Sequence, residues 1–284
     1  NITLEIRRGE ILSLLGENGS GKTTLMNMLS GIYFPDSGQI YVNGEEVSIA
    51  SPKDALDLHI GMIHQHFKLV DVFTAAENII LGLREEGKLD LKKASEKIKE
   101  ICDTYGFDID PQQKIYNMSV SQKQTVEIVK VLYRGADILI LDEPTTGLDP
   151  QTRQLIWNVI EKLQKTEDMT VFLTTHYMEE AANAGYVVIL DKGSIAAEGT
   201  PFELKNDYVQ DIVSVYGVSE DEIKSLNREY KKIRDGYQIK VRNTKEATKL
   251  IVEHQDLFKD YEVVKGGMDD VFLAVTGKRL GGEH

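Results

Sequence analysis

The stretch that decides the fold is residues 10–29, which read EILSLLGENGSGKTTLMNML in a chain of 284 residues. Residues 10–15 are mostly apolar, which is typical of a buried strand. A glycine-rich loop follows at residues 16–21, and the apolar spacing of residues 22–29 is typical of a helix. Strands and helices that alternate in this way favour an α/β fold with a mostly parallel sheet.

The loop matches the pattern G-x-x-x-x-G-K-[ST] of the P-loop, which binds nucleotide phosphates. Its glycines let backbone N–H groups point at the phosphates where the helix begins. We expect Lys22 to reach the β- and γ-phosphates and the Thr23 hydroxyl to ligate Mg²⁺. A glycine-rich turn without a ligand is the alternative, and the Lys-Thr pair between a strand and a helix argues against it. The expected nucleotide-binding residues here are Gly16, Glu17, Asn18, Gly19, Ser20, Gly21, Lys22, Thr23 and Thr24.

A second apolar stretch, residues 138–141, runs directly into Asp142 and Glu143. Ligands of α/β folds bind at the carboxyl ends of the strands, where these two carboxylates are expected to lie. Asp142 can hold Mg²⁺ through water, and Glu143 can polarise a water that attacks the γ-phosphate. A strand that ends in Asp-Glu could equally be a solvated loop, but after a P-loop it predicts a hydrolytic site.

Six motifs follow one another in the order found in the nucleotide-binding domain of ABC ATPases, which the chain resembles over about residues 1–204. The motifs are the P-loop, Gln65, Ser119-Val120-Ser121-Gln122, Asp142-Glu143, Asp149 and His176. The resemblance implies a P-loop ATPase with ATP and Mg²⁺ as cofactors.

The resemblance also assigns the catalytic and metal-binding groups. Gln65 would contact Mg²⁺ and sense the membrane subunit, and His176 would be the switch histidine that acts with Glu143 in hydrolysis. Thr23, Gln65 and Asp142 are therefore the expected metal ligands. His176 alone would more often be a structural histidine, and its place directly after a predicted strand favours the catalytic role.

Four further residues are implied to act across a dimer interface. Ser119, Ser121 and Gln122 belong to the signature that contacts the γ-phosphate held by the opposite subunit, and Asp149 belongs to the D-loop. The expected partners are a second ATPase domain, identical or paralogous, and membrane-spanning permease subunits. The expected location is the cytoplasmic face of the cell membrane, peripheral through those permeases.

The signature departs from the commonest family form. It reads Met-Ser-Val-Ser-Gln where Leu-Ser-Gly-Gly-Gln is usual, so Val120 and Ser121 stand where glycine would allow close backbone approach. Sugar-importer relatives carry similar variants, so activity is still expected. The chain also begins inside the family pattern, and the first strand of the domain is expected to be missing from it.

The two halves of the chain resemble different branches of the family. Residues 61–141 are similar to sugar or nucleoside importer ATPases, whereas residues from 145 onward are similar to drug or ABC-2-type exporter ATPases. The closing residues 268–277 also match the exporters. Importers of the first kind usually carry two ATPase domains in one chain, and one is visible here, so export is favoured over import.

The sequence predicts two domains. Residues 1–204 would form the ATPase, with an antiparallel β subdomain at the Asn43-Gly44 hairpin signal and a helical signature subdomain at about residues 74–130. Residues 205–284 would form a small α+β domain. Within it, residues 237–241 and 261–264 are expected strands, and a capping box at Asn243 and Glu246 begins a helix between them.

Composition excludes several other classes. The net charge of −13 argues against broad nucleic-acid binding, and no apolar run is long enough to span a bilayer. Cys102 is the single cysteine and is expected to be buried filler.

A soluble ABC ATPase of translation or repair is the main alternative, but the chain lacks long coiled-coil arms and a tandem ATPase domain. A second alternative is a nucleotide-binding module that dimerises without hydrolysis, and the presence of Glu143 and His176 argues against it.

Overall fold

The computed structural model describes residues 2–83 and 90–277 of the chain. The backbone contacts divide the chain into two compact units, Asn1–His176 and Tyr177–His284. The predicted domain boundary near residue 204 stays a prediction.

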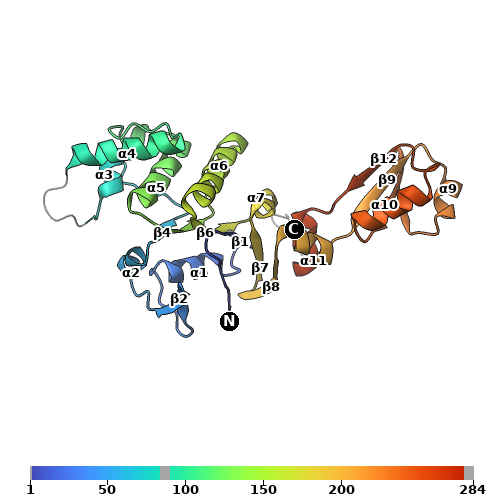
Figure 1. Cartoon of the computed structure of the whole chain (residues 1–284), viewed down its shortest axis with the longest axis horizontal. Coiled ribbons are helices and arrows are strands. Elements are labelled where there is room, and N and C mark those ends of the chain that lie inside the picture. Colours follow the sequence, from blue (N-terminus) through green and yellow to red (C-terminus); the bar gives the residue numbers. More distant parts are fainter. Residues whose placement is uncertain (1, 84–89, 278–284) are drawn as a thin grey trace. The chain divides into compact units, whose positions relative to one another are not determined.

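The first unit is built on a parallel sheet (Figure 1). Its strands are β1 (Ile11–Gly16), β4 (Ile60–Ile63), β5 (Ile138–Asp142) and β6 (Thr170–Thr175), in the order β4-β5-β6-β1. All three strand pairings are parallel. Every residue of β1 and β6 is buried, which explains their continuous apolar sequences. The predicted α/β fold with a mostly parallel sheet is confirmed.

Helices pack on these strands, and the first unit also contains a short β-hairpin. The helices are α1 (Lys22–Leu29), α2 (Pro52–Asp57) and α6 (Pro150–Glu167). The strands β2 (Ile40–Val42) and β3 (Glu45–Val47) pair antiparallel around the two-residue turn Asn43-Gly44. Both turn residues have positive φ, 53° and 82°, as a type I′ turn requires.

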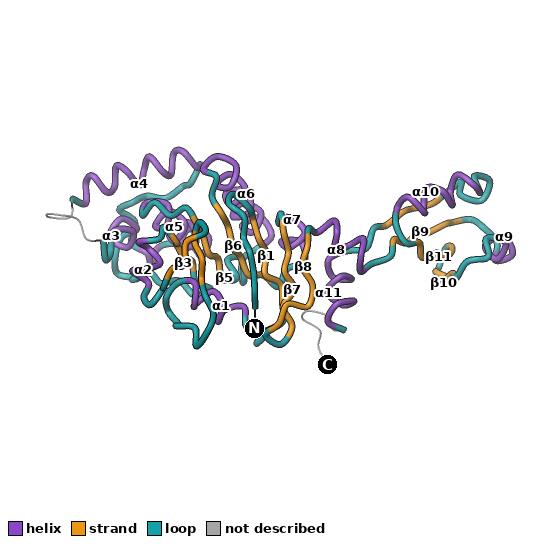
Figure 2. The backbone as a smooth tube through the Cα atoms, turned by 60° about the horizontal axis from the view of Figure 1, so that its bottom comes forward, coloured by secondary structure: helices purple, strands orange, loops and turns teal. Residues whose placement is uncertain are grey.

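A helical part of the first unit lies between β4 and β5 in sequence and has its own core (Figure 2). Its helices are α3 (Ala75–Ile80), α4 (Leu91–Tyr105) and α5 (Val120–Tyr133), with a 3₁₀ turn at Ile115–Asn117. Ile79, Ile98 and Val129 are fully buried in this core, and Cys102 is 3% exposed. Burial also raises the pKa of the Cys102 thiol to about 11, so it is an unreactive packing residue.

The second unit contains a hairpin with helices and a separate four-stranded sheet. The hairpin is β7 (Tyr186–Asp191) and β8 (Ser194–Gly199), with α7 (Met178–Asn183), α8 (Pro201–Tyr208) and α11 (Met268–Thr276) nearby. The closing helix α11 contacts α7 and α8. The chain therefore leaves this group of helices after α8, forms the four-stranded sheet, and returns.

The four-stranded sheet extends the α+β tail predicted from the sequence. It has the order β10-β11-β9-β12 and only antiparallel pairings. Its strands are β9 (Asp211–Tyr216), β10 (Tyr230–Ile233), β11 (Gly236–Val241) and β12 (Tyr261–Val264), and its helices are α9 (Glu220–Ser225) and α10 (Thr244–Glu253). This β-α-β-β-α-β order is the split βαβ arrangement.

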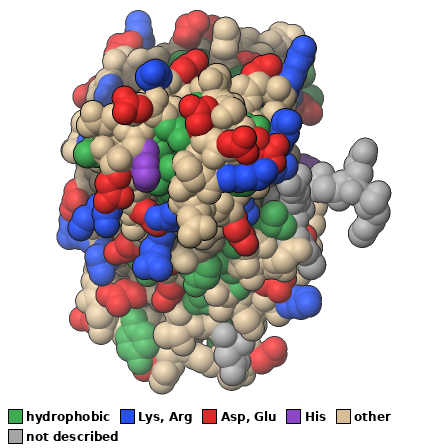
Figure 3. All heavy atoms as spheres, turned by 90° about the vertical axis from the view of Figure 1, so that its right-hand side faces the viewer, with side chains coloured by type: hydrophobic (Ala, Val, Ile, Leu, Met, Phe, Trp, Pro, Cys, Tyr) green, Lys and Arg blue, Asp and Glu red, His purple; other side chains and the backbone are tan. Residues whose placement is uncertain are grey.

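No described helix has the length and apolar character needed to cross a bilayer. On the face shown in Figure 3, basic and acidic side chains are interspersed.

The helical core generates a stability prediction. Ile98→Ala should lower the free energy of unfolding by about 2–5 kcal/mol, because it leaves a cavity where the side chain is fully buried. Leu91→Ala is the control on the same helix, since Leu91 is 45% exposed and should change stability by no more than about 0.5 kcal/mol. Urea unfolding can be followed by the fluorescence of Trp157, the single tryptophan, which lies in the same unit. Equal losses in both variants would contradict this description of the core.

Candidate functional site

The P-loop connects β1 to α1, as the sequence predicts, and its shape depends on glycine. Gly19 and Gly21 have φ of 82° and 103°, which side chains rarely adopt. Gly21 is the N-cap of α1, and no side chain caps this end of the helix. The free N–H groups of the first turn are therefore available to an anion.

Lys22 is held inside the loop. Its side chain is 4% exposed, and Nζ donates to the carbonyl oxygens of Gly16 at 2.7 Å and Glu17 at 3.1 Å. Burial lowers the pKa of the ammonium group, while the carboxylates of Glu143 and Asp142 act in the opposite direction. A phosphate that enters the loop would meet a buried cation that is already positioned.

Asp142 ends β5 and is 3% exposed. Its Oδ1 accepts a hydrogen bond from Thr174 Oγ1 at 2.8 Å and lies 3.3 Å from Thr23 Oγ1. A carboxylate and a hydroxyl from two segments thus meet beside the P-loop, and oxygen donors of this kind suit Mg²⁺. Among the described residues, no group of three or more His, Cys, Asp or Glu could hold a metal ion alone. This donor set fits a Mg²⁺ ion that is bound together with substrate phosphates and water.

Glu143 adopts a left-handed backbone conformation with φ of 48°. Its N–H donates to Thr174 Oγ1 at 2.9 Å, and its carbonyl accepts from the N–H of Thr146 at 3.2 Å. Such a conformation costs a non-glycine residue about 1–2 kcal/mol, so these bonds are needed to maintain it. The turn directs the side chain toward the P-loop, where Glu143 Oε1 lies 3.9 Å from Lys22 Nζ.

The two carboxylate oxygens of Glu143 have different surroundings. Oε2 accepts from Gln65 Nε2 and from Thr146 Oγ1, both at 3.2 Å, and lies 3.5 Å from His176 Nδ1. Oε1 faces Lys22 instead. The structure therefore brings Gln65, Glu143 and His176 together around one carboxylate, the three residues that the resemblance implied to be catalytic.

A cavity of about 310 Å³ is lined by the P-loop together with Gln65 and Glu143. The lining residues are Asn18, Gly19, Gly21, Lys22, Thr23, Thr24, Gln65 and Glu143.

The predicted signature and D-loop residues do not line this cavity. Ser119 is the N-cap of α5, where its hydroxyl accepts from the N–H of Gln122 at 3.2 Å and its own N–H donates to Gln122 Oε1 at 3.0 Å. Val120 beside it is 53% exposed. Asp149 caps α6, and hydrogen bonds from Thr152 lower the pKa of its carboxyl. These groups lie on helix ends outside the phosphate pocket.

Two threonines that were not predicted from the sequence also shape the site. Thr174, on β6, links the carboxylate of Asp142 to the backbone of Glu143, and Thr146 binds the Glu143 carboxylate. A threonine at the end of a strand next to the Asp-Glu strand is the only signal that could have identified Thr174. The contact between Thr174 and Asp142 depends on the β5–β6 register, which places the two residues opposite each other.

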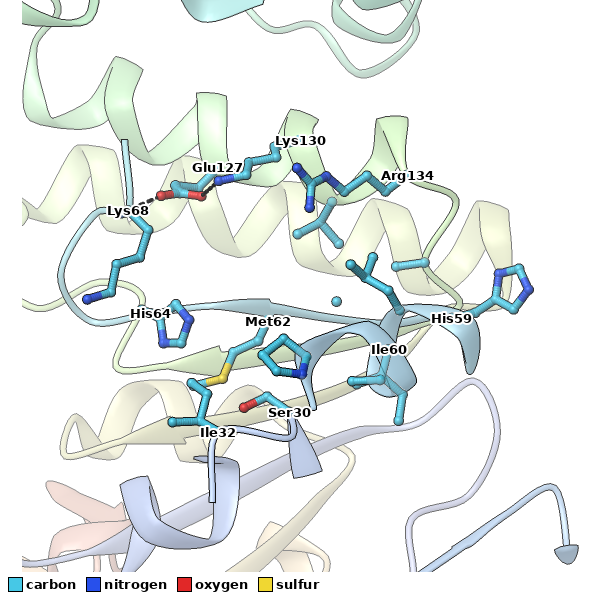
Figure 4. Close-up of a pocket in the computed structure, with 16 residues that line it drawn as sticks. Ser30, Ile32, His59, Ile60, Met62, His64, Lys68, Glu127, Lys130 and Arg134 are labelled. Carbon is cyan, nitrogen blue, oxygen red and sulfur yellow. Dashed lines mark hydrogen bonds and ion pairs between the residues drawn. The ribbon is translucent and has the colours of Figure 1, made fainter. Parts of the chain in front are cut away.

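A second cavity, of about 190 Å³, is lined in part by residues close to Gln65 in the sequence, but Gln65 itself does not line it (Figure 4). We call it the β4–α5 groove. Its apolar lining includes Ile60, Met62 and Val131, and basic groups from the Gln65 segment and α5 surround it. All of its lining residues are Ser30, Ile32, Pro52, Ala55, Leu56, His59, Ile60, Gly61, Met62, His64, Lys68, Glu127, Lys130, Val131, Arg134 and Ala136.

Comparisons with known proteins agree with this geometry. Residues 1–146 match the protein family described as ABC transporter. The guanosine import ATP-binding protein NupO of Bacillus subtilis is 52% identical over 167 residues, 58% of this chain and 33% of NupO. The nucleoside import ATP-binding protein NupA of Lactococcus lactis is 47% identical over 195 residues, 68% of this chain and 38% of NupA. The chain thus spans between a third and two fifths of the length of these curated relatives.

Solved structures show the same fold for most of the chain. The dimeric post-hydrolysis state of the ATP-binding cassette MJ0796 bound to ADP and Pi has a TM-score of 0.62 and 26% identity, and covers 70% of this chain and 89% of that one. CbiO1 from Clostridium perfringens, part of the ABC transporter complex cbiONQ, has a TM-score of 0.64 and 28% identity, and covers 72% and 83%. The predicted P-loop fold and the resemblance to ABC ATP-binding domains are confirmed. Such domains are ATPases, which is the predicted enzyme class.

The predicted preference for export finds no support. The named relatives NupO, NupA and the ribose import ATP-binding protein RbsA are all import proteins. The preference depended on counting one ATPase domain in the chain. Because the chain spans less than half of these relatives, that count says nothing about the direction of transport.

The position of Thr174 generates a prediction. Thr174→Val should lower the rate of ATP hydrolysis by about 10- to 100-fold, because Asp142 and the Glu143 backbone both lose the hydroxyl that orients them. Thr174→Ser keeps the hydroxyl and should stay within about threefold of the parent. Ser13→Ala is the control, since Ser13 is also fully buried and its hydroxyl has no hydrogen-bond partner among the described residues. Steady-state phosphate release measures all three, and an unchanged rate in Thr174→Val would contradict the positioning role.

Proposed function

The chain belongs to the ABC transporter family, and we propose that it is the ATP-hydrolysing motor domain of a transporter that imports nucleosides or sugars. One observation carries the ATPase part of this proposal. A phosphate cradle with a buried lysine and a hydrogen-bonded glutamate face each other across a single cavity. The names of the relatives support import, and NupO and NupA support a nucleoside as the cargo.

Binding of ATP would use the P-loop. The N–H groups around Gly21 and the ammonium of Lys22 would hold the β- and γ-phosphates. Thr23, Asp142 and the amide oxygen of Gln65 would hold Mg²⁺, which neutralises charge on the phosphates when it is bound. Gln65 would then exchange its present bond to Glu143 for the contact with Mg²⁺, as its amide oxygen turns toward the metal.

Hydrolysis would use the carboxylate of Glu143. A water placed between Glu143 and the γ-phosphate would attack phosphorus while one of its protons passes to Glu143 Oε1. The bond from the γ-phosphorus to the bridging oxygen breaks, and ADP and phosphate are the products. His176 and Thr146 contact the other oxygen, Oε2, and would keep the carboxylate turned toward the water.

The site would be completed by a second ATPase domain. Ser119, Ser121, Gln122 and Asp149 lie outside the cavity, so one chain provides the P-loop face without the signature. Ser119 and Val120 are exposed at the start of α5, where a second P-loop could approach them. The structural relative MJ0796 is described as a dimer with ADP and Pi, which supports the same assembly here.

Permease subunits would contact the β4–α5 groove. The groove has an apolar floor that ends near Gln65, so a segment that fills it could affect the nucleotide site. Through such contacts the chain would lie at the cytoplasmic face of the membrane. CbiO1, described as part of a transporter complex, supports an assembly with other subunits.

The motor proposal predicts a trapped dimer. Glu143→Gln should hydrolyse ATP at least about 100-fold more slowly and accumulate as a dimer with Mg-ATP, because nucleotide binding remains while the base is lost. Lys22→Ala should show neither hydrolysis nor dimer, since the buried charge contact to the phosphates is gone. Size-exclusion chromatography with and without Mg-ATP distinguishes the monomer from the dimer for each variant. Full hydrolysis by Glu143→Gln would contradict the assigned role.

The import proposal has its own test. Proteoliposomes that contain the chain with its membrane partners, with the ATPase outside, should release labelled nucleoside or sugar from the lumen to the ATPase side when ATP is added. This is the import direction, because the ATPase side corresponds to the cytoplasm. Lys22→Ala should abolish the movement. ATP-driven accumulation in the lumen would mean export and would overturn the proposed direction.

A further inference from the structure

Glu127 is a buried carboxylate that the proposed hydrolysis does not use. It lies in the middle of α5 and is 5% exposed. A buried charge is costly unless it is hydrogen-bonded or paired. The partners of Glu127 therefore indicate what this residue does.

The shorter of its two polar contacts reaches another segment of the chain. Glu127 Oε1 accepts from the backbone N–H of Lys68 at 2.7 Å, and Oε2 lies 3.5 Å from Lys130 Nζ on the same helix (Figure 4). A bond of this length between a carboxylate and an N–H is strong, since the acceptor is charged. Lys68 follows Gln65 in the segment that leaves β4. Glu127 thus fastens the Gln65 segment to α5.

Each end of this connection leads to a functional group. On one side, Gln65 binds the Glu143 carboxylate at the nucleotide cavity. On the other, α5 continues without a break from Glu127 to its N-terminus, where Ser119 caps it. Val126 and Val129 on the same helix are fully buried, so α5 is packed firmly into the core of the helical part.

We propose that Glu127 is a positioning residue that couples the Gln65 segment to α5, so that the contacts Gln65 makes at the nucleotide cavity set the position of Ser119. This inference rests on the proposed function, in which Ser119 meets the nucleotide of a second chain. When Gln65 exchanges Glu143 for a bound nucleotide, the backbone at Lys68 moves with it and carries Glu127. Without the bond, nucleotide would still bind to one chain, but α5 would not be set for the second.

The test uses the full chain in the Glu143→Gln background, with dimerisation in Mg-ATP measured by sedimentation equilibrium. Glu127→Leu removes the acceptor but keeps an apolar side chain of similar volume, a replacement that buried charges often tolerate. It should weaken the ATP-dependent dimer by about tenfold or more. Glu127→Gln keeps an acceptor oxygen for the Lys68 N–H and should stay within about threefold. Affinity for Mg-ADP, measured by calorimetry on single chains, should change by less than about twofold in both.

Glu161→Leu is the matched control, because Glu161 forms an ion pair with Lys165 on α6 and has no contact with the Gln65 segment. It should dimerise like the parent. If Glu127→Leu does not fold, Lys68→Pro removes the N–H donor from the other side of the same bond and should weaken the dimer equally.

Three results would overturn the inference. Dimerisation of Glu127→Leu as strong as the parent would show that the connection is not needed. An equal loss in Glu127→Gln would assign the effect to the negative charge, and a parallel loss of Mg-ADP affinity would assign it to general disruption. A Glu143→Gln parent that stays monomeric in Mg-ATP would instead refute the proposed function on which the comparison depends.

Discussion

Three parallel strands end at the same edge of the first unit's sheet, and this alignment brings together the main polar groups of the candidate site. Gly16 at the end of β1 begins the P-loop, Asp142 ends β5, and Thr174 lies opposite Asp142 on β6. The strands are buried along most of their length, so their side chains can meet a ligand mainly where the strands end. The residues proposed to bind phosphate and metal and to act in hydrolysis therefore lie at a single edge.

Backbone strain at this edge is confined to Glu143, whose side chain must point toward the P-loop. Glu143 takes a left-handed conformation at a cost of about 1–2 kcal/mol, and the gain is a carboxylate that points back over the P-loop. Three hydrogen bonds of about 0.5–1.5 kcal/mol each offset that cost: Glu143 N–H donates to Thr174, and its carboxylate accepts from Thr146 and Gln65. Gln65 also belongs to the segment that Glu127 holds. Glu143 and helix α5 are thus connected through a few polar bonds.

Local sequence was enough to predict the site residues that lie within a continuous motif. Lys22 and the Asp142-Glu143 pair were identified because a strand, a turn and a helix determine their positions within a few residues. Thr174 and Glu127 were not, because their contacts depend on register and packing between segments far apart in sequence. Strand β9 was also missed, since its burial pattern does not follow a regular alternation of apolar and polar residues. The direction of transport did not follow from the number of ATPase domains, because the chain spans less than half the length of the importers it resembles.

In the proposed assembly, one chain supplies half of each ATP site. A crystal structure of the Glu143→Gln chain with Mg-ATP would test this assembly through the position of the γ-phosphate. We expect two chains in which the γ-phosphate lies between Lys22 of one chain and Ser119 of the other, within hydrogen-bond distance of both. A γ-phosphate enclosed by a single chain, with Ser119 of both chains far from any nucleotide, would contradict it.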